Sequence, residues 1–193
     1  MNTKAIALTA IFSALTVALS PVFSGIAVPA PYFPLLSYQI WEIPIVAAFL
    51  LISPESGFAV SLIHAAVRLS FSPSYIIVAG TVASLSMLLG IYLAHKRITR
   101  KFKQAKPLSQ WRAVLYYTAL GIVFRTLVMA VFNYALLRYP VMGVSLPEPA
   151  IIAATPLIAL FNATQPLYVI PLGYFIAKTI GKNLEIGSRI EPP

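Results

Sequence analysis

Long apolar stretches dominate the chain, and only proline, glycine and short polar turns interrupt them. Charged residues make up just 10% of its 193 residues, and hydrophobic residues make up 59%. Soluble domains carry about 25% charged residues, so this chain has too few charged side chains to cover a water-facing surface. The composition therefore predicts an integral membrane protein and argues against a soluble globular enzyme, a disordered chain or a fibrous protein.

The apolar stretches predict an all-α membrane protein with six transmembrane helices in one domain that covers residues 1–193. A helix needs about 20 apolar residues to cross a bilayer. The first stretch resembles a signal peptide, but it lacks a small-residue cleavage site before Pro21, so we expect a retained helix. The predicted spans are Ala5–Val22, Tyr38–Ile52, Glu55–Phe71, Tyr75–Ala94, Val114–Leu137 and Pro156–Lys178.

The positions of the basic residues predict the orientation in the cell membrane. Most Lys and Arg residues lie near the N-terminus, in a basic loop at about 95–112, or in a tail at 179–193, whereas the opposite side holds only Arg138. Loops rich in Lys and Arg stay in the cytoplasm, so we expect both termini to be cytoplasmic. This topological role explains the loop better than binding to nucleic acid or lipid, so no nucleic-acid partner is expected.

The first predicted outer loop, Phe23–Ser37, combines prolines with aromatic and aliphatic residues, among them Tyr32 and Phe33. Proline removes amide donors and fixes φ, so the loop should be stiff and extended. It is also too apolar for a freely solvated loop. Two interpretations are equally open: the loop folds back over the protein as a lid, or it lies at the bilayer interface, where aromatic residues are enriched.

Polar side chains inside the spans gather in the outward half of the predicted bilayer, between about 5 and 18 Å from the outer helix ends. Such residues are costly in a membrane and indicate function. They are Glu42, His64, Arg68, Arg125, Asn133, Asn162 and Gln165. The fourth predicted helix contributes none, so we expect it to face lipid.

These side chains predict a polar pocket that is open to the outside and roofed by the first outer loop. Aromatic surface is available from Tyr38, Trp41 and Tyr134, so the pocket would suit a flat aromatic ligand. The alternative is a buried structural network, for example with Glu42 paired to Arg68. For Arg125 by itself, the structural interpretation is the favoured one.

The sequence contains few residues suited to catalysis. It has five acidic residues and no cysteine, and it lacks the motifs of P-loop NTPases, zinc proteases and serine hydrolases. A coupled carrier would usually show an acid near the midplane or an inverted repeat. We therefore expect no enzyme, no catalytic cofactor, no metal site and no energy source within the chain.

Two further patterns carry a family resemblance. Ala10, Ala14 and Ala18 form a smooth stripe on the first predicted helix, suited either to a partner helix or to packing within the chain. The segment 38–44, with Glu42 before Ile43-Pro44, precedes a small-residue turn at 53–57. With Arg125-xxx-Met129-xxx-Asn133-Tyr134 and Phe161-Asn162, these motifs resemble the substrate-binding S components of energy-coupling factor (ECF) vitamin transporters, nearest to the riboflavin-specific group.

This resemblance implies a subunit that captures riboflavin, as transported ligand, from outside the cell. It would assemble with an ECF transmembrane scaffold subunit and two cytoplasmic ATPases, which alone would use ATP. The alanine stripe would contact the scaffold subunit, and Asn133, Asn162 and Gln165 would contact the ligand. Gln165 stands where the family commonly has lysine, and Glu42 replaces a usual aspartate. An S component for another vitamin or precursor, and a non-transport membrane scaffold or assembly protein, remain the alternatives.

Overall fold

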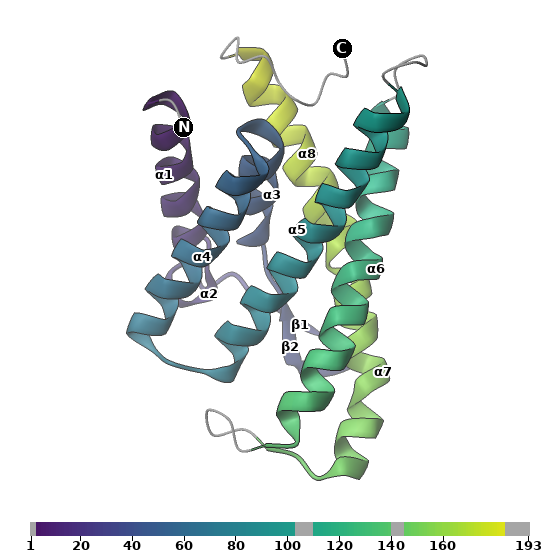
Figure 1. Ribbon diagram of the computed structural model, residues 1–193. Helices are drawn as coiled ribbons and strands as arrows, with labels where there is room; N and C mark the ends of the chain where they lie inside the picture. The colour runs from purple at the N-terminus through teal and green to yellow at the C-terminus, as the bar shows by residue number, and fades with distance from the viewer. Residues whose placement is uncertain (1–2, 103–109, 140–144, 184–193) are drawn as a thin grey trace.

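The computed structural model describes residues 3–102, 110–139 and 145–183, which form helices and one two-stranded sheet (Figure 1). The elements are α1 (Thr3–Ala18), α2 (Pro21–Ser24), β1 (Val28–Ala30), β2 (Phe33–Tyr38), α3 (Glu42–Leu51), α4 (Pro54–Phe71), α5 (Tyr75–Phe102), α6 (Gln110–Leu137), α7 (Glu148–Thr164) and α8 (Pro166–Asn183).

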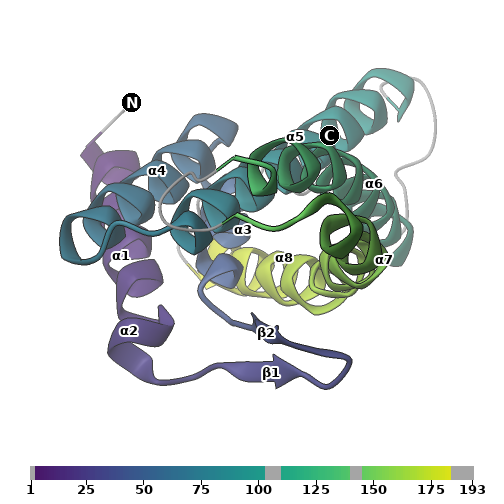
Figure 2. The ribbon, with the colours of Figure 1, turned by 90° about the horizontal axis from the view of Figure 1, so that it is seen from below.

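The short helix α3 forms the centre of the fold. All of its residues are buried, because α1, α4 and α8 pack around it. Seen from below, α3 lies between α4 and α8, and the β1–β2 hairpin runs along the outside of α8 (Figure 2). A helix that is apolar on all sides, as α3 is apart from Glu42, is suited to such a surrounded position.

The helix ends are gathered at two ends of the molecule. Helix α1 begins, α5 ends, α6 begins and α8 ends at the upper end of Figure 1. The hairpin, α2, the α4–α5 connection, the end of α6 and the start of α7 lie at or toward the lower end. The chain therefore runs back and forth between the two ends of the molecule.

The turn between α3 and α4 is built from local capping chemistry. The Ser53 hydroxyl accepts a hydrogen bond from the Ser56 amide at 3.2 Å, and Pro54 occupies the first turn of α4. Serine at the N-cap followed by proline is typical of a helix start. The predicted boundary between the second and third spans is therefore confirmed to within one residue on either side.

Several predicted boundaries were wrong. The second helix begins at Glu42 rather than Tyr38, because Tyr38 is the last residue of β2. The first helix ends at Ala18 rather than Val22, because Pro21 begins the separate helix α2. Helix α5 continues past Ala94 to Phe102, and α6 begins at Gln110. Part of the predicted basic loop is therefore helical, and residues 103–109 lie outside the described part of the chain.

The sixth predicted span differs most from the structure. It begins at Glu148 instead of Pro156, and it is broken into α7 and α8 at Gln165-Pro166. Proline lacks the amide hydrogen that an uninterrupted helix requires and crowds the preceding turn. Most of the predicted tail beyond residue 178 lies outside the described residues, apart from the end of α8 at Asn183.

The outer surface supports the membrane location. Within the described residues, the segments Tyr75–Ile98, Trp111–Leu137 and Glu148–Asn183 are long and apolar enough to cross a membrane, and α1 and α3 are shorter apolar helices. Large apolar side chains are exposed on the outside, for example Leu115 at 66% and Val131 at 71%. Such a surface suits lipid rather than water. The count of six crossings stays a prediction.

We predict that Gly90→Ala destabilises the protein, because α5 and α6 approach closely at this glycine. A Cβ at Gly90 would lie 2.4 Å from the Leu120 carbonyl oxygen, which is too close for any carbon atom. Forcing the helices apart costs about 1–3 kcal/mol, so the thermal unfolding midpoint in detergent should fall. Gly80→Ala is the control on the same helix, because its Cβ would meet Trp41 at an ordinary 3.6 Å. Equal midpoints for both variants would contradict the packing described here.

Candidate functional site: a cavity bounded by the hairpin and four helices

A cavity of about 440 Å³ lies between β2, the start of α3 and the helices α4, α5, α6 and α7. Its volume falls within the range of roughly 300–1,000 Å³ that is usual for small-molecule sites. Its walls are mostly apolar, with Phe33, Trp41 and Phe161 among the aromatic residues. The polar or charged residues in the walls include Gln39, Glu42, His64, Arg68, Arg125, Asn133, Asn162 and Gln165.

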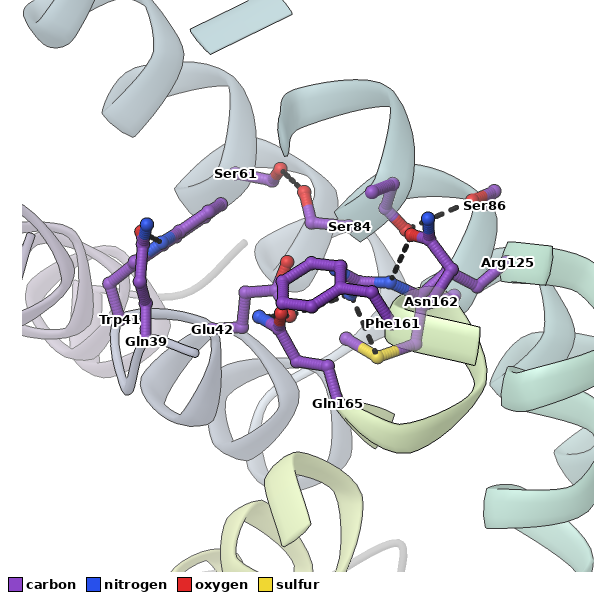
Figure 3. A network of polar contacts seen from close by, with 12 residues as sticks. Gln39, Trp41, Glu42, Ser61, Ser84, Ser86, Arg125, Phe161, Asn162 and Gln165 are labelled. Carbon is purple, nitrogen blue, oxygen red and sulfur yellow. Dashed lines mark hydrogen bonds and ion pairs between the residues drawn. The ribbon is translucent and has the colours of Figure 1, made fainter. Parts of the chain in front are cut away.

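A buried ion pair joins two of the predicted site residues. Arg125 Nη1 lies 2.7 Å from Glu42 Oε2, and the two side chains are 2% and 0% exposed. Gln165 Nε2 donates to the same Glu42 oxygen at 2.9 Å, and Arg125 Nε donates to Asn162 Oδ1 at 3.1 Å. Figure 3 shows these four side chains converging from α3, α6, α7 and the α7–α8 break. The suggested pairing of Glu42 with Arg68 is therefore wrong.

Local structure positions each member of this network. Glu42 lies in the first turn of α3, where the helix dipole favours a negative charge. Asn162 Nδ2 donates to the Ile158 carbonyl of its own helix at 2.9 Å, which directs its carbonyl oxygen toward Arg125. Gln165 stands at the break between α7 and α8. The break thus places a side-chain hydrogen-bond donor, Gln165 Nε2, next to the Glu42 carboxylate.

Helix α5 also contributes to the cavity, which corrects the expectation that the fourth helix faces only lipid. Tyr75, at its start, donates a short hydrogen bond to Asn133 Oδ1, and Asn133 Nδ2 donates to the Met129 carbonyl at 2.7 Å. Ala79, Gly80 and Ala83 line the wall beyond Tyr75. The run of small residues on α5 was the available sequence signal, because small side chains leave space beside a helix.

Several polar groups in the cavity wall have no protein partner within the described structure. The His64 ring stacks on Trp41 at 4.1 Å between centroids, with 19° between the planes. Both nitrogens of His64 and the Nε of Arg68 are buried and lack a hydrogen-bond partner within the described structure. The same holds for Glu42 Oε1 and Gln165 Oε1. Since unpaired buried polar atoms are costly, these atoms are available to a bound molecule.

The hairpin folds back over the protein, as one of the two interpretations of the first outer loop required. Tyr38 Oη lies 2.7 Å from the Thr164 hydroxyl and 2.5 Å from Tyr32 Oη. Tyr168 Oη donates to the Gln39 carbonyl at 2.8 Å. These contacts fasten the end of β2 to the α7–α8 break. The loop is extended, as predicted, and its two strands form a β-hairpin with a register irregularity between Pro29 and Ala30.

The predicted site residues therefore separate into three groups by position. Most of them line the cavity: Phe33, Trp41, Glu42, His64, Arg68, Asn133, Asn162 and Gln165. Tyr32 and Tyr38 lie outside its wall and anchor the hairpin instead. Tyr134 is exposed and donates to Glu148 Oε1 at 3.2 Å, so it belongs to the surface and not to the cavity.

The alanine stripe lies on the surface of α1. Ala10, Ala14 and Ala18 are exposed, and so are Ile11 and Leu15 beside them. Helix α1 packs against α3 and α4 through a different face, which includes Phe12 and Thr16. The stripe is therefore not used for packing within the described chain.

We predict that the buried ion pair behaves as a unit in stability measurements. Arg125→Met leaves the Glu42 carboxylate buried without its counterion, which costs about 3–5 kcal/mol, and Glu42→Gln leaves Arg125 unpaired. The double variant should lie closer to the wild type than the sum of the single effects, as measured by unfolding in detergent. Arg138→Met is the control, because its ion pair with Glu148 is half exposed and contributes about 0–1 kcal/mol. Additive single effects would contradict coupling.

Comparison with known proteins finds a relative by structure and not by sequence. No family model matches the chain, and no curated protein sequence matches it. A solved structure of the S component of a bacterial ECF transporter superposes with a TM-score of 0.74 over 96% of this chain and 99% of that one, at 20% sequence identity. The chain therefore has the fold of an ECF transporter S component.

Proposed function

We propose that this chain is the substrate-binding membrane subunit of an ECF-type importer, and that it captures riboflavin or a related flat aromatic vitamin from outside the cell. The shared fold supports the class of protein. The resemblance of the motifs around Glu42, Asn133 and Asn162 to the riboflavin group supports the class of ligand. Transport would depend on a scaffold subunit and two ATPases, because the chain shows no nucleotide-binding motif of its own.

The observation that carries the proposal is that four residues of the cavity wall have buried polar atoms without partners. Glu42, His64, Arg68 and Gln165 all line one cavity, and each has a buried atom without a partner in the described residues. A purely structural network would be expected to satisfy its own donors and acceptors. A ligand with several polar atoms on a flat ring system would supply the missing hydrogen bonds and fill the apolar wall.

The alternatives predict different properties. An S component for another vitamin would use the same cavity, and the departures from the family pattern at Gln165 and Glu42 point to this possibility. A membrane scaffold or assembly protein would need no space of about 440 Å³ among buried polar groups. The cavity therefore favours a binding protein over a scaffold. A test of flavin binding separates riboflavin from another vitamin as the ligand.

We further propose that the hairpin end faces outward and both termini face the cytoplasm. Lys96, Arg97, Arg112 and Lys182 lie on the parts of α5, α6 and α8 that meet at one end of the molecule, whereas Arg138 lies at the hairpin end. Positive charge is retained on the cytoplasmic side. In this orientation the cavity lies under an extracellular lid.

We predict that the purified protein quenches flavin fluorescence in a saturable titration and that Phe33→Ala weakens this binding. Phe33 is the hairpin residue whose ring lines the cavity, so its loss removes ring contact and loosens the cover, with an expected affinity loss of about tenfold. The flavin should also dissociate faster. Val28→Ala is the matched control, because Val28 lies on β1 of the same hairpin, is 62% exposed and is not part of the cavity wall.

The two variants separate a specific site from unspecific association with the apolar surface. Equal effects of Phe33→Ala and Val28→Ala would contradict the hairpin as a lid. Absence of flavin binding by well-folded protein would exclude flavins, and mass spectrometry of small molecules that copurify with the protein would then test the remaining vitamin hypotheses.

We predict that Ala14→Trp prevents assembly with an ECF scaffold subunit while flavin binding persists. Ala14 lies in the middle of the exposed stripe on α1, and a bulky ring there would keep a partner helix at a distance. The measurement is copurification after coexpression with the scaffold subunit and both ATPases. Ala119→Trp is the control, since Ala119 is an exposed alanine on α6. Unchanged copurification of the Ala14 variant would refute this role of the stripe.

A further inference from the structure

We infer that the cavity takes its aromatic ligand in an acidic form, with a carboxylate or phosphate group bound at the Arg68–His64 end. The inference rests on the proposed function, since it concerns the ligand of the same cavity. It adds a specific preference for a negative charge at a defined place, which a neutral vitamin such as riboflavin would satisfy less well than an acidic one.

The charges in the cavity walls do not balance. Two guanidinium groups, those of Arg68 and Arg125, face the cavity together with a single carboxylate, that of Glu42. That carboxylate is already paired with Arg125, through the contact of 2.7 Å between Arg125 Nη1 and Glu42 Oε2. Arg68 has no ion pair or hydrogen bond of its side chain within the described residues, and its Nε is buried. One positive charge is thus left for another molecule to neutralise.

No acidic residue of the described part of the chain is placed to pair with Arg68. Glu148 pairs with Arg138 at the surface. Glu55 lies in the first turn of α4, whereas Arg68 lies in its last turn, which separates their backbones by roughly 20 Å at about 1.5 Å per residue. A partly buried cation without a counterion is costly, and a ligand anion would remove this cost.

His64 adds a second group to the same place. It precedes Arg68 by four residues on α4, so the two side chains share one face of the helix. The ring is 2% exposed and stacks on Trp41, which fixes its plane, yet neither of its nitrogens has a protein partner in the described structure. One ring N–H together with the forked donors of Arg68 is a donor set that suits carboxylate or phosphate oxygens.

The Glu42–Gln165 end and the Arg68–His64 end of the cavity would then bind different parts of the ligand. Glu42 Oε1 and Gln165 Oε1 are unpartnered acceptors, so they suit N–H or O–H groups on a ring and would repel an anion. Arg68 and His64 lie on α4, whereas Gln165 stands at the break between α7 and α8. A molecule with a neutral, hydrogen-bonding ring and an acidic substituent would satisfy both ends in one orientation.

The experiment compares pairs of ligands that share a ring system, one neutral and one with an acidic group. Riboflavin and riboflavin 5′-phosphate share the ring, and 2-naphthamide and 2-naphthoate are close in shape. Affinity for the flavins is measured by fluorescence quenching, and stabilisation by the naphthyl pair is measured from the thermal midpoint. The proteins are the full chain, Arg68→Gln, and the control Arg138→Gln, which removes an arginine that is not in the cavity wall.

We expect the wild type to prefer the charged member of each pair by about tenfold for the flavins, the effect of one charge-assisted hydrogen bond. Arg68→Gln should abolish this preference while it leaves the affinity for riboflavin within about twofold of the wild type. Arg138→Gln should leave both values unchanged. Acetate and inorganic phosphate alone should stabilise the wild type and Arg68→Gln equally, because the anion binds as part of an aromatic molecule.

The outcomes distinguish the inference from the proposed function. Flavin binding without a preference that depends on Arg68, together with no preference between the naphthyl compounds, overturns the inference and leaves the importer proposal intact. If neither flavin binds but naphthoate stabilises the wild type and not Arg68→Gln, the acidic ligand is supported and the flavin is excluded. Equal responses of all three proteins to every anion overturn the inference as an unspecific salt effect.

Discussion

The buried pair of Glu42 and Arg125 is the interaction on which the rest of the interior depends. Two full charges lie 2.7 Å apart and are at most 2% exposed, so each requires the other and further hydrogen bonds. Gln165 and Asn162 provide those bonds. Since the four residues come from α3, α6, α7 and the α7–α8 break, charge neutralisation fixes how these segments meet. The cavity is the space that remains beside this fixed arrangement.

The break between α7 and α8 links the interior to the hairpin. Pro166 interrupts the helix, and the side chains of the two residues before it contact different parts of the molecule. Gln165 reaches the central carboxylate, whereas Thr164 contacts Tyr38 at the end of β2. Tyr168, in the first turn of α8, donates a hydrogen bond to the Gln39 carbonyl. A movement of the hairpin would therefore act on the same segment that contacts Glu42. The hairpin and the polar network are thus both attached to the α7–α8 break.

The polar groups of the cavity divide into those satisfied by the protein and those left open. Arg125 and Asn162 form hydrogen bonds with neighbouring side chains, so they hold the shape of the cavity wall. His64, Arg68 and one oxygen each of Glu42 and Gln165 lack such partners within the described structure. Groups of the second kind determine which molecule fits, because only a ligand or water can complete them.

The sequence by itself determined the apolar helical character, the α3–α4 turn, and most of the charged and polar residues that line the cavity. These follow from composition, capping chemistry and the cost of polar groups among apolar ones, which act locally. Only the tertiary structure decided that Glu42 pairs with Arg125, that α5 forms a cavity wall, that Tyr134 lies on the surface, and that the first loop is a hairpin. Such features depend on which helix faces meet, and hydropathy along one chain does not encode that.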